Sequence, residues 1–260
     1  MTTAAAVFVV ADRELLAQAL AARLVTALVE RQAATPRARL LLAGDPLVDE
    51  VLAAVSASPA RDAVDWAALD VWWADDAWAP AADPARADRR AWRALFAAVS
   101  ADGTGPDLHP VPSSDRTADV DEAAARYVSQ LAAAREIDDH GPTPQFDVAL
   151  LVVRADGSVA GLFPEMPALH DDRAGCAVRG APVAPTTRVT LTLAGLAPAA
   201  EVWLVGEGAD VATAVHLMLG GAGAVQVPAA GIRGSRRTVV MLDRSAAARL
   251  PQALSRLASP

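Results

Sequence analysis

The chain has 260 residues, of which 53% are hydrophobic and 21% are charged, and its mean hydropathy is +0.26. This composition excludes intrinsic disorder, and the length suits one α/β domain with a large core, so we expect a single domain over residues 1–260. Acidic residues number 31 and basic residues 23, and the net charge of −8 opposes binding to nucleic acid or to an anionic membrane.

All 23 basic residues are arginine, because the sequence contains no lysine. This excludes a lysine Schiff base and the lysine of a phosphate-binding P-loop. The single cysteine, Cys176, cannot form a disulfide within the chain or a thiolate metal site, which favours a reducing compartment. The first residues lack the basic flank and long apolar run of a signal peptide, and no run of 18 apolar residues occurs. We therefore expect a cytoplasmic protein.

The first half of the chain alternates helical patterns with short apolar runs. Asp12 is a candidate N-cap for a helix whose apolar residues recur at spacings of three and four as far as Leu28. Apolar runs at 37–44 and 69–74 predict buried strands, the second leading into a loop rich in Pro and Asp. Further helices are predicted at 47–56, 88–99 and 119–136, and the loosest segments at 103–114 and 138–144.

The second half contains the strongest strand signal of the chain, FDVALLVV at 146–153, which leads directly into a segment containing glycine. Other strands are predicted at 188–193, 201–206 and 238–243, and helices at 209–219 and 244–257. This alternation indicates a doubly wound, modified Rossmann-like α/β fold, with a mainly parallel central sheet, helices on both faces and FDVALLVV as an interior strand. Sites in such sheets lie beyond the carboxyl ends of the strands, here the loops after Ala43, Ala74, Val153 and Val205.

Several segments resemble one known family, the 6-phosphogluconolactonases. FDVALLVVRADGSVAGLFPEMPAL (146–169) resembles the family signature, in which a buried strand runs into G-x-G-x-D-G-H-x-A-S-L-F-P. Residues 64–96 resemble the family's tryptophan strand with its G-D-E-R turn, and 186–215 resemble the R-I-T-L-T strand and the strand ending G-x-x-K. Residues 228–250 fit the C-terminal strand and helix. The resemblance covers nearly the whole chain and implies a fold related to glucosamine-6-phosphate and ribose-5-phosphate isomerases.

The activity that this resemblance implies is hydrolysis of 6-phosphogluconolactone to 6-phosphogluconate, a step of the pentose phosphate pathway, with no metal or cofactor. The family's general base is the histidine of D-G-H, which falls at Ser158 in this chain. A serine hydroxyl cannot take a proton from water at neutral pH, so the resemblance implies that the base is deleted. It places the catalytic positions at Asp156, Ser158 and Asp75.

Positions that hold sugar or phosphate in the family carry different residues here. Asp45 brings a negative charge into the family's Gly-Gly-Ser loop, and the next residue, Pro46, lacks an N–H donor. Other replacements are Ala77 for the arginine of G-D-E-R, Ala209 for the lysine of G-x-x-K, and Val152 and Arg154 for two glycines. Each lost cation or donor removes a charge-assisted hydrogen bond worth about 1.5–3 kcal/mol. We therefore expect a neutral or negative cleft.

Candidate substrate-binding residues, for a sugar-phosphate ligand, are those at matching positions: Gly44, Asp45, Asp76, Arg154, Gly157 and Arg188. Arg154 is the best candidate for a phosphate anchor, because it projects from the loop that loses the histidine. Structural roles compete with these assignments. Asp75 can cap its loop, Asp156 and Gly157 form an ordinary turn dipeptide, and Arg188 can pair with a neighbouring aspartate.

Three hypotheses about function stay open. The first is a lactonase homologue with lost or strongly reduced activity; the second is an active lactonase with His170 as a relocated base and arginines as phosphate anchors. The third is a non-catalytic partner of a sugar-phosphate enzyme. A nucleophilic Ser158 is disfavoured because the segment lacks a G-x-S-x-G elbow, and the scattered histidines predict no metal site. Trp78 is the tryptophan expected to fill space that substrate uses in the family.

Overall fold

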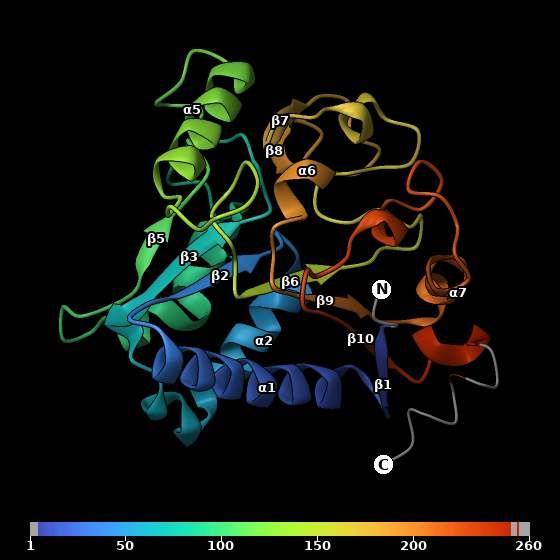
Figure 1. Cartoon of the computed structure of the whole chain (residues 1–260), viewed down its shortest axis with the longest axis horizontal. Coiled ribbons are helices and arrows are strands. Elements are labelled where there is room, and N and C mark those ends of the chain that lie inside the picture. The colour runs from blue at the N-terminus through green and yellow to red at the C-terminus, as the bar shows by residue number, and fades with distance from the viewer. Residues whose placement is uncertain (1–4, 251–253, 255–260) are drawn as a thin grey trace.

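The computed structural model describes residues 5–250 and 254. Its centre is a seven-stranded sheet in the order β1-β10-β9-β6-β2-β3-β5, in which every pair of neighbours is parallel (Figure 1). The strands are β1 (Ala6–Val10), β2 (Ala38–Leu42), β3 (Leu69–Trp73), β5 (Asp107–His109), β6 (Val148–Val152), β9 (Glu201–Gly206) and β10 (Arg237–Asp243). This order confirms the predicted doubly wound α/β class.

β6 lies in the middle of the sheet, between β9 and β2. All five of its residues are buried, and Leu150 lies opposite Trp203 on one side and Leu42 on the other. A run of apolar residues without alternation requires cover on both faces, which this position supplies. The prediction of FDVALLVV as an interior strand is therefore confirmed.

Two long helices pack against each other below the central strands in the view of Figure 1: α1 (Arg13–Ala34) and α2 (Pro46–Ala57). Asp12 is the N-cap of α1, as predicted, and its side chain accepts a hydrogen bond from the Leu15 N–H at 2.9 Å. The buried leucines of α1 recur at spacings of four, Leu16, Leu20, Leu24 and Leu28. This spacing fixes the face that α1 turns toward the sheet.

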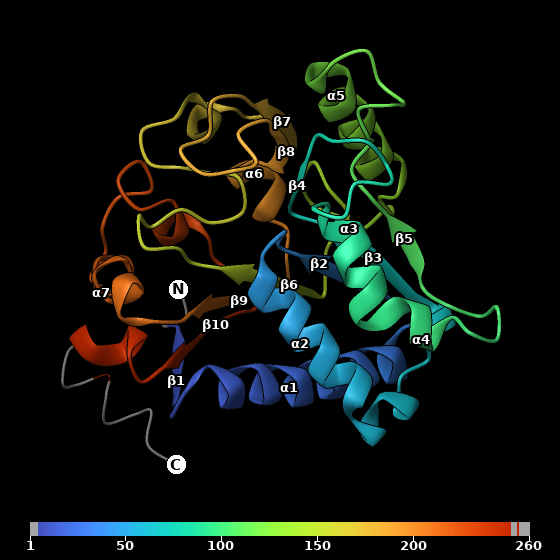
Figure 2. The ribbon, with the colours of Figure 1, turned by 180° about the vertical axis from the view of Figure 1, so that it is seen from behind.

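The remaining helices are shorter. α3 (Ala87–Ala91), a π-helical turn (Trp92–Phe96) and α4 (Ala97–Val99) follow one another where one helix was predicted, and Figure 2 shows this segment beside α2. α5 (Val120–Ala133), α6 (Leu193–Leu196) and α7 (Ala212–Leu219) lie farther along the described part of the chain, with short 3-10 turns between. The helix predicted at 244–257 is a 3-10 turn at Ala246–Arg249, and most of the rest of that range lies outside the described residues.

A second sheet of three antiparallel strands lies above the central one in Figure 1, in the order β4 (Asp75–Ala77), β8 (Arg188–Leu191) and β7 (Gly175–Val178). The strand predicted at 188–193 therefore belongs to this sheet and not to the parallel one. It ends at Leu191 because Thr192 caps α6, its Oγ1 accepting a hydrogen bond from the Gly195 N–H at 3.1 Å. The register places Ala77 opposite Arg188, which brings two family motifs together.

Two strands of the central sheet were not predicted. β1 has a β-branched and aromatic sequence, AVFVV, that is typical of strands, so its signal was present. β5 lies inside the segment predicted as loop, because three residues at the edge of a sheet leave too short a pattern to recognise. No helix of the described residues is long and apolar enough to cross a membrane.

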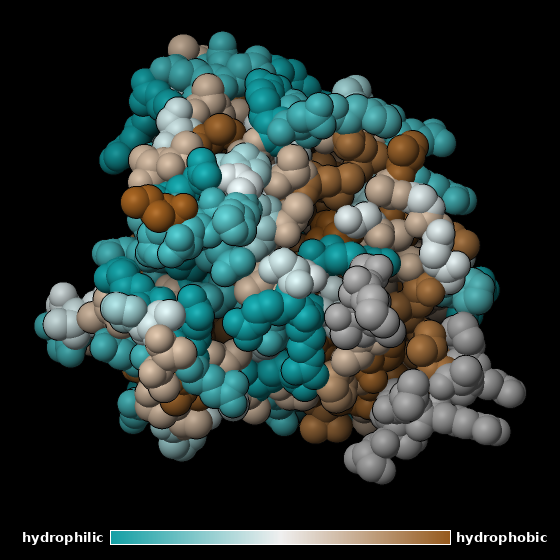
Figure 3. All heavy atoms as spheres, in the orientation of Figure 1, coloured by the Kyte–Doolittle hydropathy of each residue, from teal (hydrophilic) through white to brown (hydrophobic). Residues whose placement is uncertain are grey.

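Apolar side chains gather on the right-hand half of the molecule in Figure 3, whereas the left-hand half is mainly hydrophilic. A groove of about 780 Å³ lies between α1 and strands β1, β9 and β10, lined by Phe8, Trp203 and Met241 among others. The guanidinium of Arg23 covers the Phe8 ring at 4.7 Å from its centroid. None of the predicted site residues lines this groove.

Candidate active site

The loops that follow β2, β3, β6 and β9 meet at one edge of the sheet. Hydrogen bonds extend the strand ladder into them: the Ala43 N–H donates to the Leu150 carbonyl at 2.9 Å, the Ala74 N–H to Leu42 at 2.8 Å, and the Val153 N–H to Val205 at 2.8 Å. The four loops singled out in the sequence are thus neighbours, as expected of parallel strands.

Asp75 lies at the centre of this edge and is 2% exposed. Its Oδ1 accepts a hydrogen bond from the Gly44 N–H at 3.0 Å, and its Oδ2 lies 3.2 Å from Nη1 of Arg188. A Cβ at position 44 would lie 2.7 Å from the Asp75 carbonyl oxygen, so this close approach requires glycine. The structure therefore brings together three predicted site residues from three segments.

The Arg188 guanidinium has several partners besides Asp75. Its Nε and Nη2 donate to the Pro185 carbonyl at 3.0 and 2.6 Å, Nη2 also donates to Val183 at 3.1 Å, and the guanidinium lies 5.3 Å from the centroid of the Phe163 ring. Burial lowers the pKa of Arg188, and the nearby Asp75 carboxylate opposes that effect. Arg188 is the partner of an aspartate, and its donors are largely used within the protein.

Arg154 and Asp45 form an ion pair across the loops that follow β6 and β2. Nη2 of Arg154 lies 3.3 Å from Oδ2 of Asp45, and Nη1 donates to the Ala160 carbonyl at 3.1 Å. Asp45 is also the N-cap of α2, accepting from the Leu47 N–H at 3.0 Å. The positive charge of Arg154 also lowers the pKa of Arg188, so the two guanidinium groups are close enough to repel each other. The cation nearest the lost histidine is thus already paired with a carboxylate.

Ser158 is fully buried, and within the described part of the chain its Oγ has no hydrogen-bond partner. Its N–H donates to Oδ1 of Asp156 at 2.9 Å, which closes a turn through Gly157. Gly157 has φ of +81°, the left-handed conformation that favours glycine. Asp156 is exposed and serves this turn, so the motif that carries the base in the family forms a packed turn here.

Asp76 faces a different set of partners from Asp75. Its Oδ1 accepts hydrogen bonds from the N–H groups of Ala77 at 2.7 Å and Ala87 at 2.8 Å, and its Oδ2 lies 3.3 Å from Nη2 of Arg86. Burial raises the pKa of the Asp76 carboxyl, and the Arg86 guanidinium counteracts this rise. Asp76 thus ties β4 to the start of α3, and its negative charge also acts on Arg188, whose pKa it raises.

Carboxylates that were not predicted also lie near the carboxyl ends of the strands. Glu207 follows β9, and burial together with the negative charges of Glu50, Asp45 and Asp243 raises its pKa, although Arg13 opposes this. The Arg13 guanidinium bridges Glu50 and Glu207. The sequence contained a signal for both: Glu207 directly follows the strand predicted at 201–206, and Asp243 is the last residue of the strand predicted at 238–243.

The Asp243 carboxylate binds a backbone N–H group of the loop that follows β9. Its carboxylate accepts hydrogen bonds from the Gly208 N–H at 3.1 Å and from the Ala246 N–H at 2.7 Å. Ala209, which follows Gly208 in the chain, is exposed and stands where the family has a lysine. Carboxylates therefore gather at this corner of the edge, while the charge of the whole cleft stays a prediction.

Among the described residues, neither of the two other residues singled out in the sequence has a hydrogen bond or ion pair with Asp75 or the Arg188 side chain, although the Trp78 N–H donates to the Thr187 carbonyl at 3.2 Å, next to Arg188. His170 is exposed at the end of a 3-10 turn (Pro167–His170). The indole N–H of Trp78 donates to Oγ1 of Thr117 at 3.0 Å, on the connection to α5.

The model of the family described as glucosamine-6-phosphate isomerases/6-phosphogluconolactonase matches residues 11–241. The chain belongs to this family. It is 44% identical over 246 residues to a 6-phosphogluconolactonase of Streptomyces coelicolor, covering 94% of each chain. It is 37% identical over 243 residues to one of Mycobacterium tuberculosis, covering 92% of this chain and 96% of the relative. The resemblance seen in the sequence is thus confirmed.

Solved structures of the family have the same fold. The 6-phosphogluconolactonase of Trypanosoma brucei superposes with a TM-score of 0.78 at 24% identity, covering 95% of this chain and 99% of that chain. That of Thermotoga maritima gives a TM-score of 0.78 at 18% identity, covering 92% and 100%. The α/β fold is therefore shared with these proteins.

Proposed function

We propose that this chain is a 6-phosphogluconolactonase homologue that has lost most or all turnover of 6-phosphogluconolactone while keeping the site's framework. The observation that carries the proposal is Ser158, which stands at the position of the family base, is fully buried and offers a hydroxyl where the reaction requires an imidazole. A positioned general base contributes about 10²–10⁴-fold to a rate. Its loss alone lowers hydrolysis by that order.

The charges around the edge support the same proposal. A phosphorylated substrate brings negative charge to a place where Asp45, Glu207 and Asp243 already concentrate carboxylates. Arg154 is paired with Asp45 and Arg188 with Asp75, so neither guanidinium is free of a carboxylate. Substrate would have to displace the Asp45 carboxylate from Arg154, which weakens binding of an anion.

The test is lactone hydrolysis at high protein concentration, corrected for spontaneous ring opening. We expect the native chain to stay near background and His170→Ala to change nothing, because His170 is exposed on its turn. Robust hydrolysis by the native chain that disappears in His170→Ala would overturn the proposal and assign the base to His170. Robust hydrolysis that survives that substitution would overturn it as well and leave another base to be found.

A further inference from the structure

A second cavity, of about 540 Å³, is lined by neither Asp75 nor Arg188 and lies between the α3 segment, the connection from β5 to α5, and α5 itself. Four arginines line it, Arg86, Arg89, Arg116 and Arg126, against a single aspartate, Asp88. The chain as a whole carries a charge of −8, so four guanidinium groups around one cavity form a local reversal of sign.

The arginines of this cavity differ in whether an acidic side chain already pairs with them. Arg86 is buried, and its guanidinium donates hydrogen bonds to the Asp88 carboxylate and to the carbonyls of Ala77 and Val111. Its role in the wall of the cavity is therefore structural. Arg126 pairs with Glu122 one turn earlier on α5. Arg89 and Arg116 have no ion pair with any acidic residue in the described part of the chain, and both are exposed. Two cations at the mouth are therefore available to an incoming anion.

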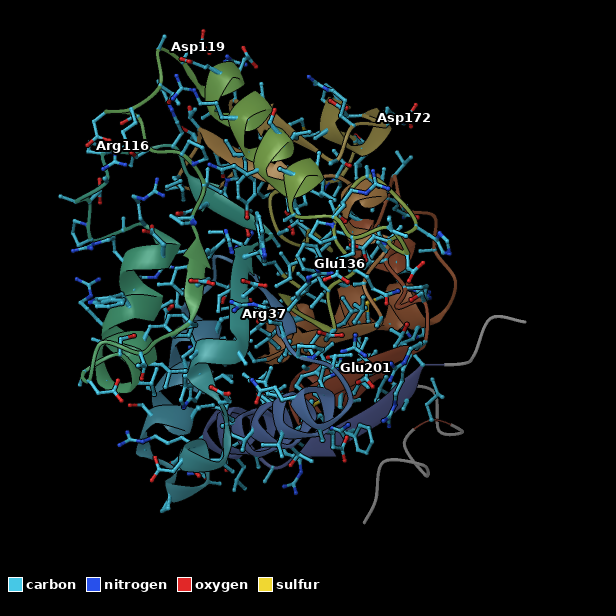
Figure 4. The ribbon with its side chains drawn as sticks, turned by 60° about the vertical axis from the view of Figure 1, so that its left-hand side comes forward. Arg37, Arg116, Asp119, Glu136, Asp172 and Glu201 are labelled. Atoms are coloured by element: carbon cyan, nitrogen blue, oxygen red, sulfur yellow. The ribbon has the colours of Figure 1, made fainter. Side chains whose placement is uncertain are left out.

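The loop that presents Arg116 is fixed by hydrogen bonds. The Ser114 N–H donates to the Ala79 carbonyl at 3.0 Å, and Oγ1 of Thr117 donates to the Ser113 carbonyl at 2.9 Å. The Trp78 indole N–H reaches Thr117 at 3.0 Å. Figure 4 shows Arg116 on this connection, which leads to Asp119 at the start of α5. A cation on an ordered loop loses little entropy on binding, which favours recognition of an anion.

The size and lining of the cavity define the ligand class. A volume of this order is typical of sites for small molecules, and guanidinium groups match the geometry of phosphate oxygens. Gln130 and Ser113 add uncharged polar groups, and the wall includes Leu108 and Pro110. A small molecule with a phosphate ester or diphosphate fits this combination better than a nucleic acid, which the negative charge of the whole chain repels.

We infer that this cavity binds a small phosphorylated metabolite through Arg89 and Arg116, with Arg126 as a third cation. The site is independent of lactone hydrolysis, because it shares no residue with the Asp75–Arg188 pair or with the Arg154–Asp45 pair. Acidic groups outside the lining also face these arginines: Glu122 pairs with Arg126, and Asp115, which accepts the Ala81 N–H at 3.2 Å, is affected by the charge of Arg116.

The probe is inorganic pyrophosphate, titrated into the full chain by calorimetry at low ionic strength. We expect saturable binding of one pyrophosphate, weakened by added salt. The double substitution of Arg89→Gln and Arg116→Gln should weaken it at least about tenfold, because two charge-assisted contacts are lost. Arg244→Gln removes another exposed arginine far along the sequence and should leave the affinity unchanged.

Three results would overturn the inference. Absence of saturable binding removes the site, and binding that the double variant retains while Arg154→Gln loses it moves the anion to the candidate active site. Binding of a short DNA duplex that is tighter than that of pyrophosphate and is lost in the same double variant makes the ligand a nucleic acid. Because the readout is binding and not hydrolysis, the first and third results leave the proposal on lactonase activity untouched, whereas binding through Arg154 would also count against the weak anion binding argued for the candidate active site.

Discussion

Asp75 and Arg188 form an ion pair in which both side chains are 2% exposed. Removing one partner leaves the other charge buried without compensation, so we expect Asp75→Ala to lower the free energy of unfolding by about 3–5 kcal/mol. Urea unfolding followed by circular dichroism measures this loss. The double variant Asp75→Leu with Arg188→Met should recover much of it, because no buried charge remains.

The matched control for this prediction is the surface pair of Arg179 and Asp121, whose side chains are 54% and 67% exposed. Arg179→Ala should change the free energy of unfolding by less than about 1 kcal/mol. If Asp75→Ala cost no more than this control, the buried pair of β4 and β8 would not stabilise the fold more than a surface pair does.

Cys176 lies on β7 and is 3% exposed. Burial raises the pKa of its thiol to about 11, so little thiolate forms at pH 8. We expect a thiol reagent such as a disulfide dye to leave Cys176 unmodified in the folded chain and to modify it fully in guanidinium chloride. Rapid modification of the folded chain would mean that β7 opens easily.

For single residues, the sequence predicts which ones belong to the site better than it predicts their burial and their partners. The sequence predicted that Asp75, Gly44 and Arg188 belong to one site, because a family motif and strand ends pointed to the same loops. It did not predict that Ser158 is fully buried or that Asp76 turns toward Arg86, because both depend on how a turn packs against distant segments. Local residue types contain no information about such packing.

At the scale of elements, helix α1 depends on its cap. Asp12 satisfies an N–H group of the first turn, so Asp12→Ala should lower the free energy of unfolding by about 0.5–2 kcal/mol. Thermal unfolding measures this change in free energy. The control is Asp172→Ala, which replaces an exposed aspartate labelled in Figure 4 and should change the free energy of unfolding by no more than about 0.5 kcal/mol. Equal effects of the two substitutions would contradict a capping role.

The elements most easily predicted were those with long patterns. Residues 13–34 and 148–152 carry clear apolar periodicity or a continuous apolar run, and both elements were placed correctly. β8 was recognised as a strand but placed in the wrong sheet, because sequence periodicity does not reveal which neighbour a strand pairs with. Its partners are short: β7 directly precedes it in the chain, whereas β4 comes from a distant part of the sequence.

At the scale of the whole molecule, the fold gathers carboxylates at the carboxyl edge of the sheet, and in our proposal these oppose binding of the family's phosphorylated substrate. The parallel order brings the loops after β2, β6 and β9 together, and their acidic residues come with them. The loss of the family's cations was visible in the sequence. The accumulation of Glu207 and Asp243 at the same edge became visible only when the strand order was known, because these residues are far apart in the chain.

This arrangement predicts that restoring the base alone does not restore the enzyme. Ser158→His supplies an imidazole, but it must enter a fully buried position, at a cost of about 1–3 kcal/mol for overpacking. The substrate would still meet Asp45 and lack cations at positions 77 and 209. We therefore expect at most a modest gain in hydrolysis over the native chain.

Larger recovery requires the phosphate-binding positions as well. Asp45→Ser keeps an N-cap for α2 while releasing Arg154, and Ala77→Arg and Ala209→Lys return two cations to the edge. Hydrolysis of 6-phosphogluconolactone, corrected for spontaneous opening, is compared in the native chain, Ser158→His and the combined variant, with circular dichroism to verify folding. The combined variant should exceed the single one by at least about tenfold, because a base acts only on substrate that is bound and oriented. Equal rates in the two variants, with both folded, would show that the native arginines already bind the phosphate and that only the base was missing.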